Sequence, residues 1–336
     1  MMSLEIRRRR QSLGLSLSEA ARQMGISRQA LLAIEQGRVP RADTALKIAR
    51  VLHTTVEALY EPDGPHRWVG RPGGRARWAW VRQLTLFRTP SLAADVSVQG
   101  TVVTPLPEAR PPERVVVIAG CDPALPIIAD WMQRLQPGWW CDVWSCPSME
   151  ALQLYRDGLV HVAGIHLFHG LGYNEPWTRD LPESTGVHSV TWEAGLVARD
   201  THDLAVWPRH WREGRMAVRQ PGSEARALAD RMAGRQGLSG AAWAGRPAQS
   251  HLEAGLWVAD GTARVAVSTR AVAALYGLEF EPWAEEPFDW VVDRSPQEGV
   301  ERLLQTLTHP LVRASLARLP GYRLDGSGEP LWSHGS

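Results

Sequence analysis

The chain has 336 residues and is 44% hydrophobic, which suits two or three globular domains with buried cores. Its net charge of +1 hides an asymmetry, because the first 110 residues carry 17 basic and 9 acidic side chains while the rest carries 20 and 27. A basic N-terminal part suits a polyanion such as nucleic acid. The three cysteines are too few for a disulfide framework, and neither a signal peptide nor a long apolar run occurs. We therefore expect a cytoplasmic protein without a membrane partner.

Residues 17–37 predict two short helices joined by a tight turn. Gly25 ends the first helix, because glycine tolerates the positive φ of a helix C-terminus. Ser27 can cap the second helix, which we expect over residues 28–36. This pattern is typical of a helix-turn-helix, in which the second helix reads DNA.

Further helices are predicted around this motif, over residues 3–13, 42–52 and 55–60. The helix over residues 42–52 has an apolar face that consists of Leu46, Ile48, Ala49 and Leu52. Residues 1–62 therefore predict an all-α domain. Residues 63–113 are rich in Gly, Pro and Arg, and they predict a linker with short β-strands.

From residue 114 the pattern changes to alternating strands and helices, which predicts an α/β domain over residues 114–325 with a mostly parallel sheet. Its length suits two lobes, one formed by residues 114–193 and 265–325 and the other by residues 194–264. Residues 326–336 are predicted as a flexible tail. The strands are expected at 115–120, 139–145, 159–165, 187–192, 195–199, 216–219, 241–244, 263–267 and 290–293, and the helices at 123–135, 148–156, 222–234, 249–260, 269–276 and 296–317.

The run LSLSEAARQMGISRQALLAIEQGRVPRADTALKIARVL resembles the helix-turn-helix domain of the lambda/434 repressor and Cro type, the XRE family. The resemblance implies that the reading helix presents to the major groove Ser27, Arg28 and Gln29, followed by Leu32 and Ala33. Arginine can bond guanine bidentately and glutamine can bond adenine, with about 1–3 kcal/mol of discrimination each. Phosphate anchoring is expected from Ser16, Ser18, Arg38 and Arg41. The resemblance also implies a structural pair between Arg10 and Glu35.

Residues 114–325 resemble the periplasmic-binding-protein-like domain that occurs fused to such DNA-binding domains and, elsewhere, to molybdenum-cofactor proteins. The resemblance rests on AGCDPAL, VAGIHLFHGLGYNEPW, RQPGSEAR, QSHLEAGLWVADGTARVAV, EPWAEEPFDWVV and LPGY. It implies a type II fold of two α/β lobes joined by a hinge, with the ligand in the cleft between them. By analogy with transport proteins, it also implies molybdate or tungstate as the ligand.

Ligands of open α/β sheets lie beyond the carboxyl ends of strands, near helix N-termini. Three loops meet this condition, at residues 120–124, 146–149 and 220–225, and their amides and hydroxyls suit an oxyanion. The candidate ligand-binding residues are Cys121, Asp122, Ser148, His166, Tyr173, Asn174, Arg219, Gly222, Ser223, Arg226 and His251. No tight metal-ligand spacing occurs, so we predict no metal site. No nucleophile with an oriented base is apparent, so we predict no enzyme.

These features predict a one-component transcription regulator that binds a DNA operator as a homodimer and needs no cofactor. A small effector in the C-terminal domain would modulate operator binding, and an oxyanion is favoured. Three alternatives stay open. The effector is a pterin-like heterocycle, as the 16 tryptophans suggest, or the C-terminal domain only dimerises, or it is a cofactor-handling enzyme.

Overall fold

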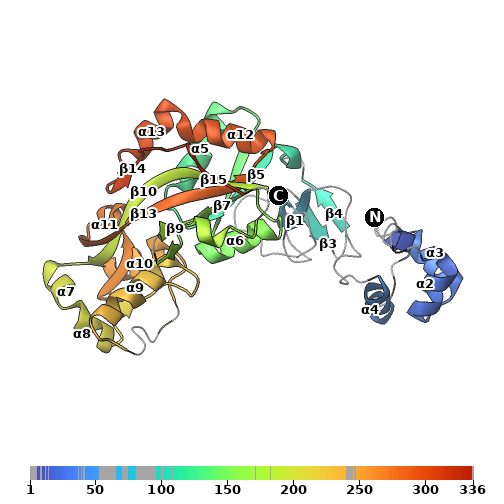
Figure 1. The fold of residues 1–336 in the computed structure, drawn as a ribbon, viewed down its shortest axis with the longest axis horizontal. Coiled ribbons are helices and arrows are strands. Elements are labelled where there is room, and N and C mark those ends of the chain that lie inside the picture. Colours follow the sequence, from blue (N-terminus) through green and yellow to red (C-terminus); the bar gives the residue numbers. More distant parts are fainter. Residues whose placement is uncertain are drawn as a thin grey trace. The chain divides into compact units, whose positions relative to one another are not determined.

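The chain folds as two compact units, Met1–Pro112 and Glu113–Ser336 (Figure 1). The computed structural model describes residues 6–7, 10–11, 13, 15–36, 38, 40, 42–52, 66–69, 75–80, 96–99, 102–106, 109–170, 172–181, 183–239, 245 and 247–334. Within these ranges, no helix combines the length and the apolar character that crossing a membrane requires.

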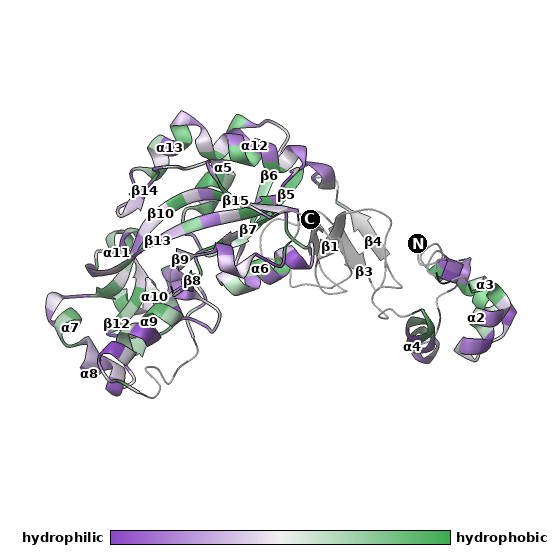
Figure 2. Ribbon diagram, viewed as in Figure 1, coloured by the Kyte–Doolittle hydropathy of each residue, from purple (hydrophilic) through white to green (hydrophobic). Residues whose placement is uncertain are grey.

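The first unit contains the helices α2 (Leu17–Met24), α3 (Arg28–Glu35) and α4 (Ala42–Val51). Ser16 and Glu19 form a capping box at the start of α2, and Gly25 ends this helix with φ of +63°. Figure 2 shows hydrophobic and hydrophilic residues on α2 and α3, as amphipathic helices require. Their apolar faces share a core that consists of Ile6, Ala20, Ala21, Met24, Leu31, Ile34, Ile48, Ala49 and Leu52.

Two details of this unit differ from the sequence-based expectation. Leu46 is 59% exposed, and the neighbouring Ala45 is buried in its place, because the apolar stripe of α4 begins one residue earlier than predicted. The helix expected over residues 55–60 lies outside the described residues.

A small antiparallel sheet, with the strand order β1-β2-β3-β4, follows in the same unit. It confirms the predicted small β segment. Its strands are β1 (His66–Val69), β2 (Arg75–Trp80), β3 (Val96–Gln99) and β4 (Val102–Pro105).

The second unit is built on one sheet with the central order β11-β12-β10-β13-β7-β5-β6, and β14 and β15 also pair with β10. The strands β5, β6 and β7 are parallel, as are β11 and β12, but every pairing of β10 and β13 is antiparallel. The prediction of a mostly parallel sheet was therefore wrong. The strands are β5 (Val115–Gly120), β6 (Trp140–Ser145), β7 (Val162–Ile165), β10 (Ser184–Ala198), β11 (Met216–Ala217), β12 (Val265–Thr269), β13 (Glu279–Asp293), β14 (Tyr322–Arg323) and β15 (Pro330–Ser333), and a separate pair is formed by β8 (Phe168–His169) and β9 (Gly172–Tyr173).

Helices cover both ends of this sheet (Figure 1). One lobe holds α5, α6, α12 and α13 beside β5, β6 and β7, and the other holds α7 to α11 beside β11 and β12. The helices are α5 (Leu125–Leu135), α6 (Ser148–Arg156), α7 (Thr201–Ala205), α8 (Trp207–Arg212), α9 (Glu224–Arg235), α10 (His251–Ala259), α11 (Arg270–Tyr276), α12 (Glu298–Thr308) and α13 (Pro310–Leu316), with 3-10 turns at Pro112–Arg114 and Glu175–Trp177. Of these, α7 and α8 had no counterpart in the prediction. The strand predicted over residues 241–244 lies outside the described residues.

The two long strands β10 and β13 connect the lobes, because each pairs with different neighbours along its length. The first half of β10 pairs with the part of β13 that borders β7, and its last five residues pair with β12. The polypeptide therefore passes back from the second lobe to the first along β13. The sequence analysis had placed this boundary at residue 265. Residues 265–278 pack in the second lobe, since α11 contacts α10 and β12.

Residues 330–333 pair with the sheet as β15, contrary to the flexible tail predicted over residues 326–336. The strand β15 pairs with β10, with Thr185 opposite Ser333 and Gly186 opposite Trp332. Gly186 is needed there, because a Cβ on this residue would lie 2.2 Å from the ring of Trp332.

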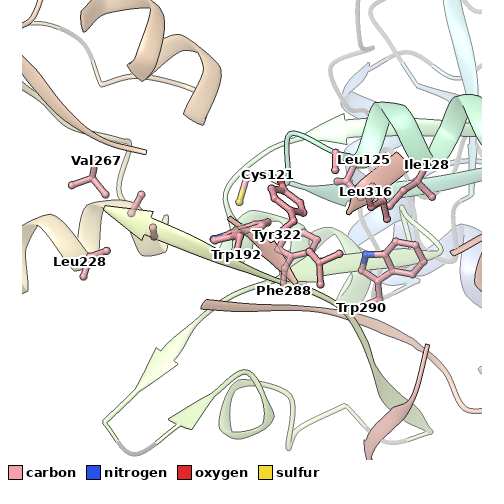
Figure 3. Packing of buried hydrophobic residues seen from close by; sticks show 14 of the residues in the cluster. Cys121, Leu125, Ile128, Trp192, Leu228, Val267, Phe288, Trp290, Leu316 and Tyr322 are labelled. Atoms are coloured by element: carbon pink, nitrogen blue, oxygen red, sulfur yellow. The ribbon is translucent and has the colours of Figure 1, made fainter. Parts of the chain in front are cut away.

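The main hydrophobic core extends from the first lobe along β10 and β13 into the second. Its largest fully buried side chains include Trp192, Phe288 and Trp290. Figure 3 shows Cys121 and Tyr322 gathered with Trp192 and Phe288 in this core. The core therefore reaches the loop that follows β5, where the sequence places candidate ligand-binding residues.

Candidate functional site

The predicted reading helix is α3, and its outward face carries the predicted base-contacting residues. Arg28, Gln29 and Leu32 are exposed, and Ala33 is half-buried. Ser27 is also exposed, and its hydroxyl caps the helix by accepting a hydrogen bond from the amide of Ala30 at 3.0 Å. The helix thus presents an arginine and a glutamine together at its N-terminal end, the end that enters the major groove in helix-turn-helix proteins.

A buried ion pair fixes this helix against the start of the chain. The Nε of Arg10 lies 2.6 Å from Oε1 of Glu35, and its Nη2 lies 3.2 Å from Oε2. The hydrogen bonds that Arg10 donates to the Glu35 carboxylate raise the pKa of Arg10. The pair confirms the structural contact that the resemblance implied.

The predicted phosphate-contacting residues are exposed where the structure describes them, which applies to Ser16, Ser18 and Arg38. The hydroxyl of Ser16 is part of the capping box of α2. Arg41 lies outside the described residues.

In the second unit, a chain of buried polar contacts links Cys121, His166 and Glu286. Cys121 Sγ lies 3.0 Å from His166 Nε2, and His166 Nδ1 lies 2.8 Å from Glu286 Oε2. Trp192 donates its Nε1–H to the same carboxylate oxygen at 3.2 Å. Burial alone lowers the pKa of His166, but Cys121 and Glu286 together outweigh it and raise that pKa well above its usual value. His166 is thus held between a thiol and a carboxylate.

His251 is the first residue of α10 in the other lobe, and its ring lies beside His166 and Trp192. Its ring centroid is 6.1 Å from that of His166 and 6.0 Å from that of Trp192. It is 1% exposed, and neither ring nitrogen has a hydrogen-bond partner among the described residues. Burial, with the charges of Arg219 and His166, lowers its pKa well below the usual value and keeps the ring neutral.

Asp122 and Tyr322 form a second buried pair at the start of the loop after β5. Asp122 Oδ1 accepts hydrogen bonds from Tyr322 Oη at 2.5 Å and from the amide of Ala124 at 2.7 Å. Burial raises the pKa of Asp122 to about 6, against the effect of these hydrogen bonds. Burial likewise raises the pKa of Tyr322 well above its usual value. The pair anchors the loop that carries Cys121.

Arg219 brings a buried cation to the site. It is 1% exposed, and its Nε donates to the carbonyl of Ala248 at 3.2 Å while Nη2 donates to that of Gln249 at 3.3 Å. Nη1 has no hydrogen-bond partner, and no ion pair joins Arg219 to a carboxylate within the described part of the chain. Burial lowers the pKa of Arg219.

Two helix N-termini meet between the lobes. The amide of Met149 in α6 donates to the carbonyl of Gly222, just before α9, at 3.3 Å. Gly222 has φ of +82°, a conformation that favours glycine. Ser148 is the first residue of α6 rather than its cap, which is Pro147, and its buried hydroxyl accepts a hydrogen bond from the amide of His166 at 3.2 Å.

Four other predicted ligand-binding residues have structural contacts of their own. Ser223 caps α9, with its hydroxyl accepting from the amide of Arg226 and donating to the carbonyl of Gln220. Arg226 pairs with Asp230 along the surface of α9. Tyr173 is half-buried and packs edge-on against Phe168.

Asn174 is the fourth of these, and it is fully buried. Its side-chain oxygen accepts from the amide of Leu167 at 2.7 Å, and its amide nitrogen donates to Asp289 at 2.6 Å. These contacts shape the loop after β7 and use both ends of the side-chain amide.

Sequence reasoning did not select Glu286, Trp192 and Tyr322, which complete the buried network around His166 and Asp122. Glu286 lies within the run EPWAEEPFDWVV and Tyr322 ends the run LPGY, two of the runs that carry the family resemblance. No local pattern distinguishes them, because their partners are about one hundred or more residues distant in sequence. Trp139, Trp207 and Trp211 are buried in the hydrophobic core.

Comparison with known families agrees with both units. A family model described as helix-turn-helix matches residues 6–59, and one described as PBP superfamily domain matches residues 129–308. A DNA-binding helix-turn-helix joined to a domain of this kind defines a ligand-responsive DNA-binding regulator. Because the second match spans more than half of the chain, the protein belongs to the PBP superfamily. Both sequence resemblances are thereby confirmed.

Solved structures resemble the chain only distantly. Full-length BenM is 13% identical over 60% of this chain and 67% of that one, with a TM-score of 0.42. The effector-binding domain of QuiR in complex with shikimate is 9% identical, and an ABC-type phosphate transport receptor from Vibrio cholerae is 11% identical. The matches to the QuiR domain and to the phosphate receptor each cover 61% of this chain and 98% of the solved structure's chain, with a TM-score of 0.44. No curated protein sequence matches the chain. Similarity this low carries no information about its ligand.

Proposed function

We propose that the chain is a one-component transcription regulator whose effector is a small oxyanion of the molybdate or tungstate type. The effector binds in the second unit beside Arg219, and its binding changes the affinity of the helix-turn-helix for a DNA operator. The operator is a near-palindrome bound by a homodimer, because a single α3 reads too few bases for specific recognition.

The observation that carries this proposal is the buried guanidinium of Arg219. A buried charge without a counter-charge costs several kcal/mol, so such a group in a folded protein is usually paired. Arg219 is 1% exposed, and its Nη1 has no partner among the described residues. An oxyanion would supply the acceptor that Nη1 lacks and would place a negative charge in contact with the guanidinium, in addition to the charge of Glu253, which acts on Arg219 without forming a described ion pair.

The ends of three helices support the same ligand class. α6 and α9 meet through Met149 and Gly222, and α10 begins at His251, whose ring is near that of His166. Helix N-termini carry partial positive charge and favour anions. Glu224, at the start of α9, does not oppose an anion as a free charge, because it lies 2.6 Å from Arg231 Nη2 and accepts from the amide of Phe168.

Regulation requires that the effector bind one arrangement of the protein more tightly than another, since equal affinity would shift nothing. The residues around Arg219 and His251 come from the second lobe, and those around His166 and Ser148 come from the first. An anion held by both sets would favour the closed arrangement of the lobes. We propose that this closure is transmitted to the DNA-binding helices of the dimer.

The proposal is tested by thermal unfolding of the full chain with molybdate, tungstate, sulfate, phosphate and a pterin. We expect stabilisation by at least one oxyanion, loss of this effect in Arg219→Gln, and its retention in Arg235→Gln, which alters an exposed arginine of α9. DNA selected from a random pool by the protein then shows whether that anion changes operator affinity. Stabilisation by the pterin alone, or by no compound, would contradict the oxyanion assignment. Turnover of the pterin would instead favour an enzyme.

A further inference from the structure

Three buried side chains with metal-binding donor atoms converge between the lobes. Cys121 follows β5 and His166 follows β7, both in the first lobe, while His251 begins α10 in the second. One sulfur and two ring nitrogens from these residues all lie within 4.8 Å of one another. The sequence spacing of these residues predicted no such site, because they are 45 and 85 positions apart along the chain.

His251 indicates that this cluster lacks a component. The ring is 1% exposed, yet neither of its nitrogens has a hydrogen-bond partner among the described residues. An unsatisfied buried polar group costs about 1–3 kcal/mol, so one in a native protein calls for an explanation. The contact between Cys121 and His166 does not involve His251, so it leaves both nitrogens of His251 without a partner. A metal ion that accepts a lone pair from the ring would satisfy one of the two nitrogens of His251.

The surroundings of His166 are those of a metal-binding histidine. Metal ligands of this type usually hold their other ring nitrogen against a carboxylate, which fixes the tautomer and the orientation of the ring. His166 Nδ1 lies 2.8 Å from Glu286 Oε2, while Nε2 faces Cys121. Trp192 holds the same carboxylate oxygen. Glu286 is therefore a positioning residue that directs Nε2 toward the centre of the cluster.

We propose that Cys121, His166 and His251 bind one zinc(II) or copper(I) ion. Thiolate and imidazole donors select these cations over calcium and magnesium, which prefer oxygen ligands. Metal–donor bonds of about 2.0–2.3 Å place neighbouring donors about 3.5 Å apart, so the contact between Cys121 and His166 must open by about half an ångström.

The ion would be held by ligands from both lobes, so it would stabilise their closed arrangement. This inference goes beyond the proposed function, because it needs neither an oxyanion nor DNA. It concerns a cation at three side chains, whereas the effector proposal concerns an anion at Arg219.

Cobalt(II) is a suitable probe, because it occupies zinc sites and shows a sulfur-to-metal charge-transfer band when a thiolate binds it. The full chain, freed of metal by dialysis against a chelator, is titrated with cobalt(II) in buffer without oxyanions. We expect a charge-transfer band that saturates at one equivalent and is displaced by zinc(II) or, without oxygen, by copper(I), but not by magnesium. Cys121→Ser should abolish the band, and His251→Gln should weaken binding at least tenfold.

Cys141→Ser is the matched control, since Cys141 lies on β6 outside the cluster, and this variant should keep the band. Glu286→Gln should weaken binding about 10–100-fold while keeping the band, as expected for a residue that acts through His166. Circular dichroism without metal shows whether each variant is folded. The absence of the band in the folded wild-type protein, or its survival in Cys121→Ser, would overturn the proposal. Arg219→Gln should keep the band, because Arg219 is assigned to the oxyanion and not to the metal ion. This variant therefore shows whether the metal site exists independently of the effector site.

Discussion

Replacing Glu35 by glutamine should destabilise the helix-turn-helix domain far more than the loss of an ordinary surface ion pair. The side chains of Arg10 and Glu35 are only 10% and 4% exposed, and they join through contacts of 2.6 and 3.2 Å. Glu35→Gln keeps the shape of the side chain but leaves the buried charge of Arg10 without a counter-charge. Removing one partner of a buried pair costs about 3–5 kcal/mol, whereas an exposed pair contributes about 0–1 kcal/mol.

A loss of this size is a large part of the total stability of a small domain, which is about 5 kcal/mol or somewhat more. Calorimetry of the full chain should therefore show an early transition shifted strongly to lower temperature, with the transition of the second unit unchanged. The double variant Arg10→Met with Glu35→Leu should recover most of the loss, because it removes both charges together. A change below about 1 kcal/mol in Glu35→Gln would refute the view that this pair is buried and structurally important.

Further variants test the reading helix and the backbone of the two units. Arg28→Ala with Gln29→Ala should weaken binding to a selected operator by about 30-fold to 10⁴-fold, given about 1–3 kcal/mol for each base contact. Unchanged operator affinity in a gel-shift assay would be inconsistent with α3 as the reading helix. Gly195→Ala should strongly lower the unfolding temperature of the second unit, because the new Cβ would lie 2.0 Å from the backbone oxygen of Glu281. Gly25→Ala should cost only about 1–2 kcal/mol in the first unit, since nothing lies within 4 Å of its Cβ position and only φ of +63° opposes it. If thermal unfolding showed equal losses of stability in the two glycine variants, the close approach of Gly195 to the backbone of Glu281 would not be what constrains β10.

The DNA-binding helices could be predicted from the sequence because their signals are local. The capping box of Ser16 and Glu19, the positive φ at Gly25 and the cap at Ser27 each depend on residues within a few positions of one another. The apolar spacing around them then sets which faces pack together. Leu46 shows the limit of this approach: Ile48, Ala49 and Leu52 are buried as predicted, but the preceding core position of α4 is Ala45, and Leu46 faces solvent.

The α/β unit was harder to predict because strand direction depends on partners far away in sequence. The runs at 187–192 and 195–199 are one continuous strand, β10, and the run at 290–293 is only the end of β13. Local alternation cannot show that these two strands pair antiparallel between the lobes. The loops after β5 and β6 could be proposed as ligand-binding because their position follows from any α/β pattern, but Glu286, which contacts His166, could not.

The most direct test of the proposed effector site is calorimetric titration of the full chain with tungstate and molybdate, in the wild type and in Arg219→Gln. A charge-assisted contact to a buried guanidinium contributes about 3 kcal/mol, so we predict saturable binding of one anion per chain that weakens about 100-fold or more in the variant. The variant should also unfold at the same or a higher temperature without anion, because it no longer buries an unpaired cation. Equal anion affinity in both proteins would contradict the assignment of Arg219 as the residue that holds the effector.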